Sequence, residues 1–183
     1  MKKYALLLLI PFLLIGLTGC GKTNNKEVDK GKTLVLEDTK LGLKTTFTYE
    51  EKLSIGDIEY SEEGKSKSVE FDIESLDAEF EMYYTNMTDI AYKDNQNTRS
   101  AQKYYKEYTF GDYKAYAYSE SGSSIKMNIL LKENDNKMYD VLFVSMERLD
   151  SDDTIIMKEV LDSEELQEFF KSIKFKKSNS KQQ

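Results

Sequence analysis

The sequence predicts an α+β fold in which a central antiparallel sheet is flanked by helices. Apolar and polar residues alternate in twos over long stretches, which is typical of half-buried strands. The links between these stretches are short and turn-like, and two further segments place their apolar residues at helical spacing. We expect one domain over residues 33–176, because this length is enough for a single hydrophobic core.

Period-two alternation predicts most of the strands. The residues expected to share a face are Leu43, Thr45, Phe47 and Tyr49; Val69, Phe71 and Ile73; Ala78, Phe80, Met82 and Tyr84; Tyr116 and Tyr118, opposite Ala115 and Ala117; and Ile125, Met127, Ile129 and Leu131. The segment from Met138 to Met146 is apolar on both faces, which favours the centre of a sheet covered on both sides. Short links at Glu62–Lys65, Glu120–Ser123 and Glu133–Lys137 indicate antiparallel neighbours.

Two segments have helical spacing. Ala101, Tyr104, Tyr105 and Tyr108 form one apolar stripe, which predicts a helix from about Thr98. Leu166, Phe169, Phe170 and Ile173 repeat this spacing near the C-terminus. There we expect Asp162 to cap the helix, with Glu165 completing a variant capping box. The segment Asp152–Val160 fits either a short helix or a returning strand.

The start of the chain predicts its location. Lys2 and Lys3 precede an apolar run from Ala5 to Ile15, as in secretory signal peptides. The following Leu17-Thr18-Gly19-Cys20 resembles the lipobox of bacterial lipoproteins. The resemblance implies removal of residues 1–19 by cleavage between Gly19 and Cys20, and attachment of a diacylglyceryl group to Cys20. An ordinary signal peptide followed by a chance cysteine is the alternative.

The composition of the region after the predicted signal peptide indicates a tether. Residues 20–32 are mostly polar and cannot build a core, so we expect a lipidated flexible tether, and residues 177–183 form a polar tail. The tether lysines suit either anionic lipid headgroups or solubility. The apolar run is shorter than the roughly twenty residues that span a bilayer. We therefore expect a chain anchored to, but not crossing, the cell membrane, on the extracytoplasmic face of a bacterium of the Gram-positive type.

Composition excludes several kinds of chemistry. The chain has no histidine and one cysteine, so it lacks Ser-His-Asp and Cys-His catalytic systems and His/Cys zinc sites. The net charge of −7 argues against nucleic-acid binding, which needs a basic face. We expect no metal, no cofactor and no enzymatic activity.

Other residue patterns are too weak to indicate catalysis or metal binding. Ser-x-x-Lys occurs at Ser100/Lys103, Ser123/Lys126 and Ser178/Lys181, without the companion motifs of acyl-serine enzymes. Asp150 to Asp153 begins like a calcium loop, but Ile155 and Leu161 replace the glycine and glutamate that such a loop needs. Pairs of acids are abundant, and we interpret them as a solvated face.

Three short segments resemble PsbP-like domains. They are the opening strand Leu41 to Tyr49, the Gly-aromatic strand Phe110 to Tyr116, and the closing segment Glu164 to Phe175. The resemblance covers about residues 33–175, although the tryptophan and proline that often follow the opening strand are missing. It implies an antiparallel sheet sandwiched between helices, in a superfamily whose members mostly bind or assist other proteins.

The clustering of tyrosines is the remaining sequence feature that bears on function. Nine of the 13 tyrosines lie between Tyr83 and Tyr118, and they either cover the sheet with their hydroxyls at the solvent or form a binding surface. The leading hypothesis is a non-enzymatic domain that binds an unidentified protein partner or assists a surface complex. The alternative is a receptor for a small ligand or glycan that uses the tyrosine-rich region. A hydrolase working through carboxylates is a third hypothesis.

Overall fold

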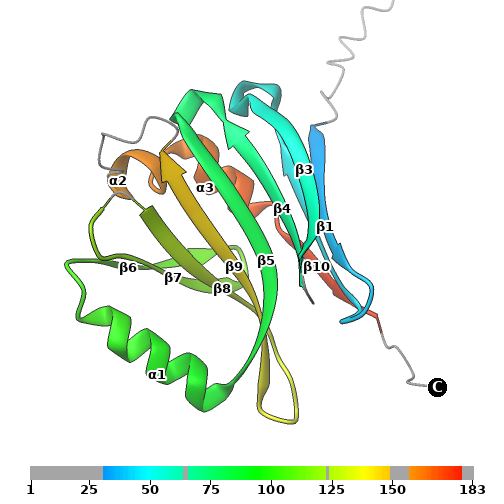
Figure 1. Cartoon of the computed structure of the whole chain (residues 1–183), viewed down its shortest axis with the longest axis vertical. Helices are drawn as coiled ribbons and strands as arrows, with labels where there is room; N and C mark the ends of the chain where they lie inside the picture. The colour runs from blue at the N-terminus through cyan, green and yellow to red at the C-terminus, as the bar shows by residue number, and fades with distance from the viewer. Residues whose placement is uncertain (1–30, 64–65, 123, 149–156, 179–183) are drawn as a thin grey trace, which may run out of the picture.

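The computed structural model describes residues 31–63, 66–122, 124–148 and 157–178. These residues form two stacked antiparallel sheets with helices at the surface, which agrees with an α+β class (Figure 1). The large, seven-stranded sheet has the order β3 (Ile55–Glu63), β4 (Ser66–Ile73), β5 (Ala78–Thr88), β9 (Met138–Arg148), β8 (Ser124–Glu133), β7 (Tyr113–Ser119) and β6 (Tyr104–Phe110). The small sheet has the order β1 (Lys32–Asp38), β2 (Leu43–Tyr49) and β10 (Lys174–Lys177).

The strand predictions agree with the large sheet. Its neighbouring strands are all antiparallel, as the short links predict. Strand β9 is the middle strand, as expected for a segment that is apolar on both faces. Val141 faces one side of the sheet, and Leu142 belongs to the core on the other side. Both side chains are fully buried.

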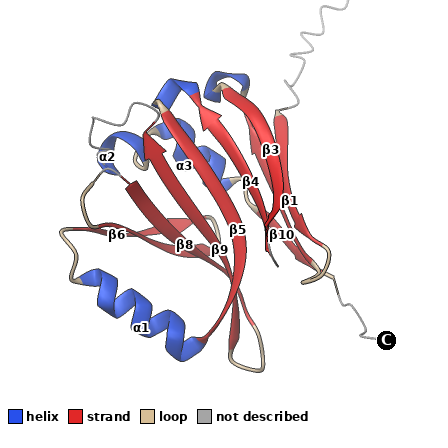
Figure 2. Cartoon of the chain, viewed as in Figure 1, coloured by secondary structure: helices blue, strands red, loops and turns tan. Residues whose placement is uncertain are grey.

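The small sheet and helix α3 (Glu164–Lys171) cover one face of the large sheet (Figure 2). We call this face the inner face. Phe47 of β2 stacks on Phe169 of α3 at 4.7 Å between ring centroids, and Phe170 packs against Phe110 of β6 at 5.0 Å. The stripe predicted for the C-terminal helix is confirmed, because Leu166, Phe169 and Phe170 are all buried.

Helix α1 (Asp89–Ser100) lies on the opposite side of the large sheet, which we call the outer face. Thr88 caps it by accepting a hydrogen bond from the Ala91 amide at 3.1 Å. Tyr92 is the buried residue of this helix, and its ring meets Tyr116 and Tyr139 edge-on, each at 5.4 Å. These tyrosines and Val141 belong to a second, smaller apolar cluster.

The helix predicted from about Thr98 is wrong. Helix α1 ends at Ser100, and the tyrosine run that follows forms strand β6. Gly111, with φ of +61°, turns the chain into β7, so β6 and β7 pair as a hairpin. Aromatic residues and threonine favour strands, and pairing with β7 outweighs a stripe that fits helical spacing by coincidence. In the strand, Tyr108 and Phe110 share the inner side and their rings stack at 5.6 Å.

Two smaller predictions need correction or completion. Ser163, not Asp162, caps α3, because its hydroxyl accepts a hydrogen bond from the Leu166 amide at 3.3 Å. Asp162 instead pairs with Lys106 of β6 at 2.6 Å. Of the undecided segment Asp152–Val160, helix α2 (Met157–Val160) is helical, and the rest lies outside the described residues. Two short 3-10 turns complete the fold, η1 (Glu51–Leu53) and η2 (Glu74–Leu76).

Candidate functional site

The residues predicted for lipid attachment, Gly19 and Cys20, lie outside the described part of the chain, as does the acidic segment Asp150–Asp153. Within the described ranges, no helix is long and apolar enough to cross a membrane. The same ranges contain no group of three or more acidic or cysteine side chains arranged to hold a metal ion. Of the Ser-x-x-Lys serines, Ser100 donates its hydroxyl hydrogen bond to the Asn97 carbonyl oxygen at 2.7 Å, and Ser123 is not described.

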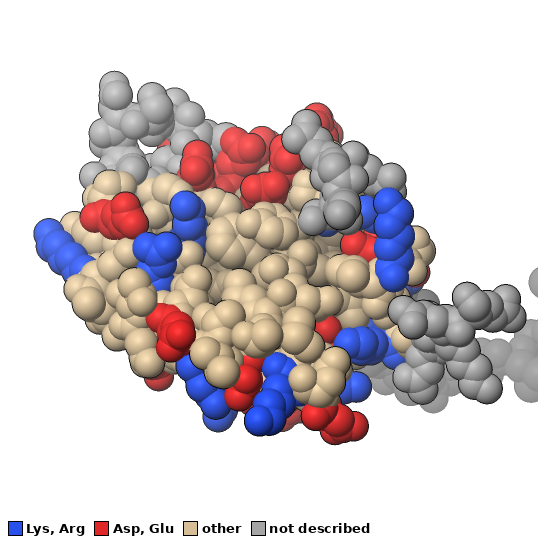
Figure 3. Space-filling view, turned by 60° about the horizontal axis from the view of Figure 1, so that its bottom comes forward, with Lys and Arg blue, Asp and Glu red and all other residues tan. Residues whose placement is uncertain are grey.

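The outer face of β3, β4, β5 and β9 is the most unusual surface of the described chain. We call it the open face, because among the described residues no helix lies over β3 and β4 on this side (Figure 2). Figure 3 shows acidic side chains gathered above a broad uncharged area of the surface. Strand register places acids beside one another on the open face.

Two rows of carboxylates cross the open face, and we call them the acidic rows. In the first row, Glu59 is directly opposite Glu70, which is directly opposite Glu81 on β5. In the second row, Asp72 is opposite Glu79, and Glu79 is opposite Glu147 on β9. A shallow hollow of about 250 Å³ lies between the rows; its lining residues are Glu70, Glu79, Glu81, Ser145 and Glu147.

One residue of the acidic rows, Glu79, holds its proton more tightly than an ordinary glutamate. Partial burial, followed by the neighbouring carboxylates of Asp72, Glu70 and Glu147, raises the pKa of Glu79 above its ordinary value. Like charges directly opposite one another across a sheet are destabilising. The fold therefore keeps an arrangement that costs stability on this face.

A strip of aromatic side chains borders the acidic rows. Tyr83 of β5 contacts Phe143 of β9, with ring centroids 4.8 Å apart. On β7, Tyr116 and Tyr118 stack at 6.1 Å, and the Arg99 guanidinium lies 4.8 Å from the centre of the Tyr118 ring. Burial, then the Glu81 carboxylate and Tyr118, raise the pKa of Tyr83.

Asn128 lies in this strip with its amide unsatisfied. It is directly opposite Tyr116 on β7 and Phe143 on β9, and its side chain is 1% exposed. Neither its amide nitrogen nor its amide oxygen has a hydrogen-bond partner among the described residues. Leaving a buried polar group unpaired costs about 1–3 kcal/mol. Both polar atoms of Asn128 are shielded from solvent, so a ligand would reach this amide only after the side chains around it move apart.

The other tyrosines of the region divide between the two faces. Tyr84 is buried on the inner face, where its hydroxyl donates to the Leu36 carbonyl oxygen at 2.9 Å. Tyr92 of α1 and Tyr116 of β7 are buried between this helix and the large sheet, and this burial raises the pKa of both hydroxyls. These tyrosines therefore contribute to the packing of the fold. Tyr83 differs from them, because it is half-buried and borders the acidic rows.

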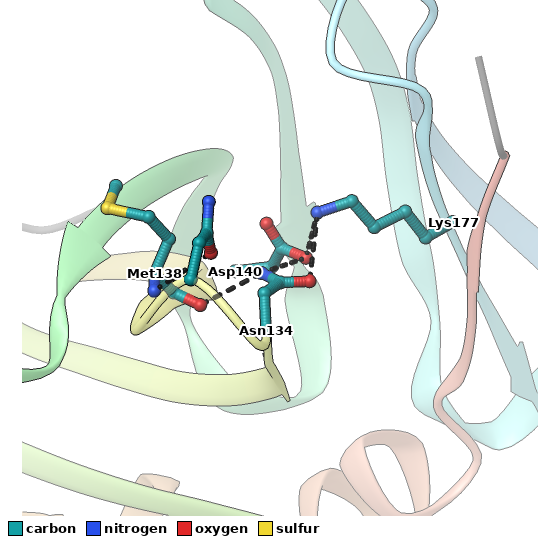
Figure 4. Close-up of polar contacts among 5 residues, drawn as sticks. Asn134, Met138, Asp140 and Lys177 are labelled. Atoms are coloured by element: carbon teal, nitrogen blue, oxygen red, sulfur yellow. Dashed lines mark hydrogen bonds and ion pairs between the residues drawn. The ribbon is translucent and has the colours of Figure 1, made fainter. Parts of the chain in front are cut away.

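A second polar hollow, of about 610 Å³, lies at the end of the β8–β9 hairpin. Figure 4 shows its centre, where the Lys177 ammonium lies 2.7 Å from Oδ2 of Asp140 and 3.2 Å from Oδ1 of Asn134. Asn134 also donates to Asp140 at 3.1 Å and to the Met138 carbonyl oxygen at 2.9 Å. Because Asp140 is 1% exposed and already paired, this cluster fastens β10 to the large sheet.

A third hollow, of about 300 Å³, lies where the described chain begins. Gly31, Tyr49 and Phe169 contribute to its wall, and Glu165 and Glu168 of α3 are also among its lining residues. The hydroxyl of its serine, Ser172, already accepts a hydrogen bond from the Thr48 amide at 2.8 Å. Nothing in this hollow matches the unsatisfied amide or the opposed charges of the outer face.

Sequence reasoning found β4, β5 and β9 of the open face, but it found neither β3 nor the acidic rows. The acids were interpreted only as a solvated face, because cross-strand register cannot be read from one strand alone. Asn128 was not singled out, although a polar residue between Met127 and Ile129 in a strand is a local signal. Comparison of the chain with protein-family models, with curated proteins and with solved structures found no match.

Proposed function

We propose that this chain is a bacterial lipoprotein whose domain binds a basic segment of a protein partner without catalysing a reaction. A lipid on Cys20 would hold it on the extracytoplasmic face of the membrane, as the lipobox-like residues Leu17 to Cys20 imply. The observation that supports the binding function is the direct opposition of acids in the acidic rows.

The energetic cost of these rows is the main support for the proposal. Each pair of like charges that face one another across a sheet destabilises the pairing of the two strands. The registers Glu59/Glu70, Glu70/Glu81, Asp72/Glu79 and Glu79/Glu147 repeat that cost four times on one surface. Solubility alone requires no such alignment, because charges of mixed sign serve it equally well. A partner that brings cations to the rows would relieve the repulsion on binding.

The chemistry of the face defines the partner. An open sheet surface with carboxylates in two rows fits lysines and arginines carried on an extended or helical segment. Such an interface gains association rate from electrostatic steering, and its affinity falls as salt rises. Tyr83 and Phe143 beside the rows offer apolar contact for the stems of these long side chains.

A set of charge-neutralising variants tests this function. We expect the triple variant E70Q/E79Q/E147Q to bind an octalysine peptide at least tenfold more weakly than the wild type, while its melting temperature rises. In cells, cross-links from the full chain to its protein partner should also be lost.

The matched control removes three exposed acids elsewhere, as D94N/D112N/E164Q. It should keep both the peptide affinity and the cross-links. Equal weakening in the two triple variants would reduce the effect to net charge and contradict a specific site.

The lipid anchor has its own test. We expect Cys20→Ser to abolish membrane retention and to leave an uncleaved or released precursor, because Cys20 is the chain's one cysteine. Detergent-phase partitioning of wild type and variant measures this directly. A variant that still partitions with membranes would contradict the anchor.

We also propose that the domain is PsbP-like in detail. The support is local: a closing helix, α3, leads into the short edge strand β10, and a Gly111 turn joins two aromatic strands. An experimental structure of this chain compared with PsbP-like domains would test the relation. A different order of strands in the shared sheet would contradict it.

A small ligand or glycan is the second candidate, and Asn128 is the observation that favours it. We expect Asn128→Leu to stabilise the fold by about 1 kcal/mol, because an apolar side chain of similar size removes the unsatisfied amide. A tetramer of N-acetylglucosamine is a suitable probe, since its acetamido groups could both donate to and accept from Asn128 once the surrounding side chains move apart. Loss of its binding in Asn128→Leu, but not in the exposed-site control Asn97→Leu, would support this function.

Carboxylate-based hydrolysis fits the open face less well. Glycoside hydrolases place two carboxyls on either side of the bond to be broken, about 5–10 Å apart. Here the acids share one sheet surface, and Glu79 and Glu147 are exposed. An open surface of this kind does not hold a substrate between two carboxyls, one acting as acid and the other as base or nucleophile.

A further inference from the structure

The outward side of the small sheet carries lysines. Along β2, Thr45 and Phe47 are buried, so Lys44 and Thr46 point away from the core. Strand β10 extends this side, because Lys176 is directly opposite Lys44, and Lys174 is directly opposite Thr46. The β1–β2 turn adds Lys40, which is exposed. We call Lys40, Lys44, Lys174 and Lys176 the basic face.

The basic face is only partly neutralised. Lys44 pairs with Glu37 at 2.8 Å. Across the described chain, no ion pair involves Lys40, Lys174 or Lys176. Like-charged Lys44 and Lys176 oppose each other across the strands, which is the same costly arrangement as in the acidic rows.

The basic face and the acidic rows lie on opposite sides of the molecule. The two sheets are stacked, and their facing sides share one core. The acidic rows occupy the outer side of the large sheet, and the lysines occupy the outer side of the small sheet. The domain is therefore strongly polarised in charge across its thickness.

We infer that the basic face rests on the anionic surface of the membrane that carries the lipid anchor. This inference builds on the proposed attachment at Cys20. Anionic headgroups attract lysines within about one Debye length, roughly 8 Å at physiological salt. A planar bilayer matches lysines spread over one side of a sheet, and the anchor already keeps the domain close to that surface.

Chain length permits this placement. Strand β1 contains seven residues and is about 23 Å long at roughly 3.3 Å per residue. The chain from Cys20 to Gly31 can reach about 36 Å when extended. An anchor at Cys20 therefore allows the whole small sheet, including its far turn at Lys40, to lie against the lipid.

Orientation of the open face follows from the same charges. With the basic face on the membrane, the acidic rows point away from it, and anionic lipids also repel them. The rows are then presented to partners on the solvent side. The membrane surface thus selects one orientation of the domain by attraction on one side and repulsion on the other.

Site-specific labelling tests this orientation in the full lipidated chain. With Cys20 acylated, Thr46→Cys and Ser145→Cys each supply one free thiol, on the basic face and on the open face respectively. An environment-sensitive fluorophore on each thiol is measured in vesicles containing bromine-labelled lipid. We expect the label at position 46 to be quenched in phosphatidylglycerol vesicles and not in phosphatidylcholine vesicles. The label at position 145 should be unquenched in both.

Charge variants give the control. K40Q/K174Q/K176Q should lose the quenching at position 46, whereas K103Q/K114Q/K132Q, which removes three exposed lysines elsewhere, should keep it. Since each lysine near an anionic surface contributes roughly fivefold, we expect the first variant to bind these vesicles roughly 100-fold more weakly. Quenching at position 145, or equal quenching at position 46 in both vesicle types, would overturn the inference.

Failure of the anchor is distinguishable from failure of the basic face. A chain that carries no lipid will not float with phosphatidylcholine vesicles. That result would contradict lipid attachment at Cys20, but it would not contradict membrane binding by the basic face. In that case co-flotation with phosphatidylglycerol vesicles still decides the inference. Binding by the wild type and not by K40Q/K174Q/K176Q supports it, and equal flotation of the two contradicts it.

Discussion

The two faces of the large sheet are covered in different ways. On the inner face, phenylalanines fill the space beneath the small sheet and α3; the fully buried ones are Phe47, Phe71, Phe80, Phe110, Phe169 and Phe170. On the outer face, a thin layer of tyrosines lies between α1 and the sheet. Tyr92 is the one residue of α1 that is buried in this layer. Beyond that layer lie the acidic rows.

The difference follows from the chemistry of the two side chains. Phenylalanine has no polar atom, so it can be buried from all sides and stabilise a closed core. A tyrosine hydroxyl needs a hydrogen-bond partner or water, which keeps a tyrosine layer near the surface. The inner face therefore supplies most of the stability, and the outer face can keep charges that cost stability. The predictions below test this division.

Truncation of the inner-face phenylalanines should have the largest effect. Phe170 is fully buried and Phe169 is 1% exposed, so we expect Phe169→Ala and Phe170→Ala each to cost about 3–5 kcal/mol. Urea unfolding measures the loss. Near-neutral results for both variants would mean that α3 is not docked on the inner face.

The outer face should tolerate truncation better. Tyr92 is 6% exposed and holds α1 against Tyr116 and Tyr139, so we expect Tyr92→Ala to cost about 2 kcal/mol. Amide hydrogen exchange should show that the loss is concentrated in α1. Tyr92→Phe, which keeps the ring, is the control and should be close to neutral. A cost in Tyr92→Ala equal to that of Phe170→Ala would remove the contrast between the faces.

The acidic rows should respond in the opposite direction. The pKa of Glu79 is raised from its ordinary value of 4.5, so the folded chain holds this proton more tightly than the unfolded chain. Its contribution to stability therefore falls as pH rises from about that value through the raised pKa. We expect Glu79→Gln to remove this pH dependence and to stabilise the fold by about 0.5 kcal/mol at neutral pH. Melting curves between acidic and neutral pH check the sign, and a destabilised variant would contradict it.

The smallest effect is expected at the edge of the tyrosine layer. The Tyr105 hydroxyl donates to Glu107 at 2.8 Å and accepts from Gln96 of α1 at 3.2 Å. Both bonds lie near solvent, so Tyr105→Phe should cost about 0.5 kcal/mol in a urea melt. A loss of ligand or partner binding in this variant would instead assign Tyr105 to a binding surface.

Much of the fold could be predicted from local pattern. Alternation identified the strands that place Phe47, Phe80 and Met127 in the core, because side-chain period is a property of a single strand. The same method failed between Thr98 and Phe110. There Tyr104, Tyr105 and Tyr108 fit helical spacing, and only pairing with β7 decides for a strand. Helix α1 was missed because it buries a single residue and so has no apolar stripe.

The candidate site was less predictable, for a physical reason. Glu70 and Glu147 are far apart in the sequence, and both become neighbours of Glu79 only through the registers of β4 and β9 against β5. The isolation of Asn128 likewise depends on Tyr116 and Phe143 in two other strands. A single sequence shows that acids and an asparagine are present in strands, but not which residues face them.

The pairing of β10 with β2 also determines when this domain can fold. Lys174 lies opposite Thr46, and Phe169 stacks on Phe47, so strand β2 obtains its partners from residues far along the chain. Contacts of such long sequence separation form slowly, because a large loop must close first. A chain emerging from the ribosome cannot complete this core until α3 and β10 are free. Under the export that we propose for this chain, the same delay would keep it unfolded during transfer.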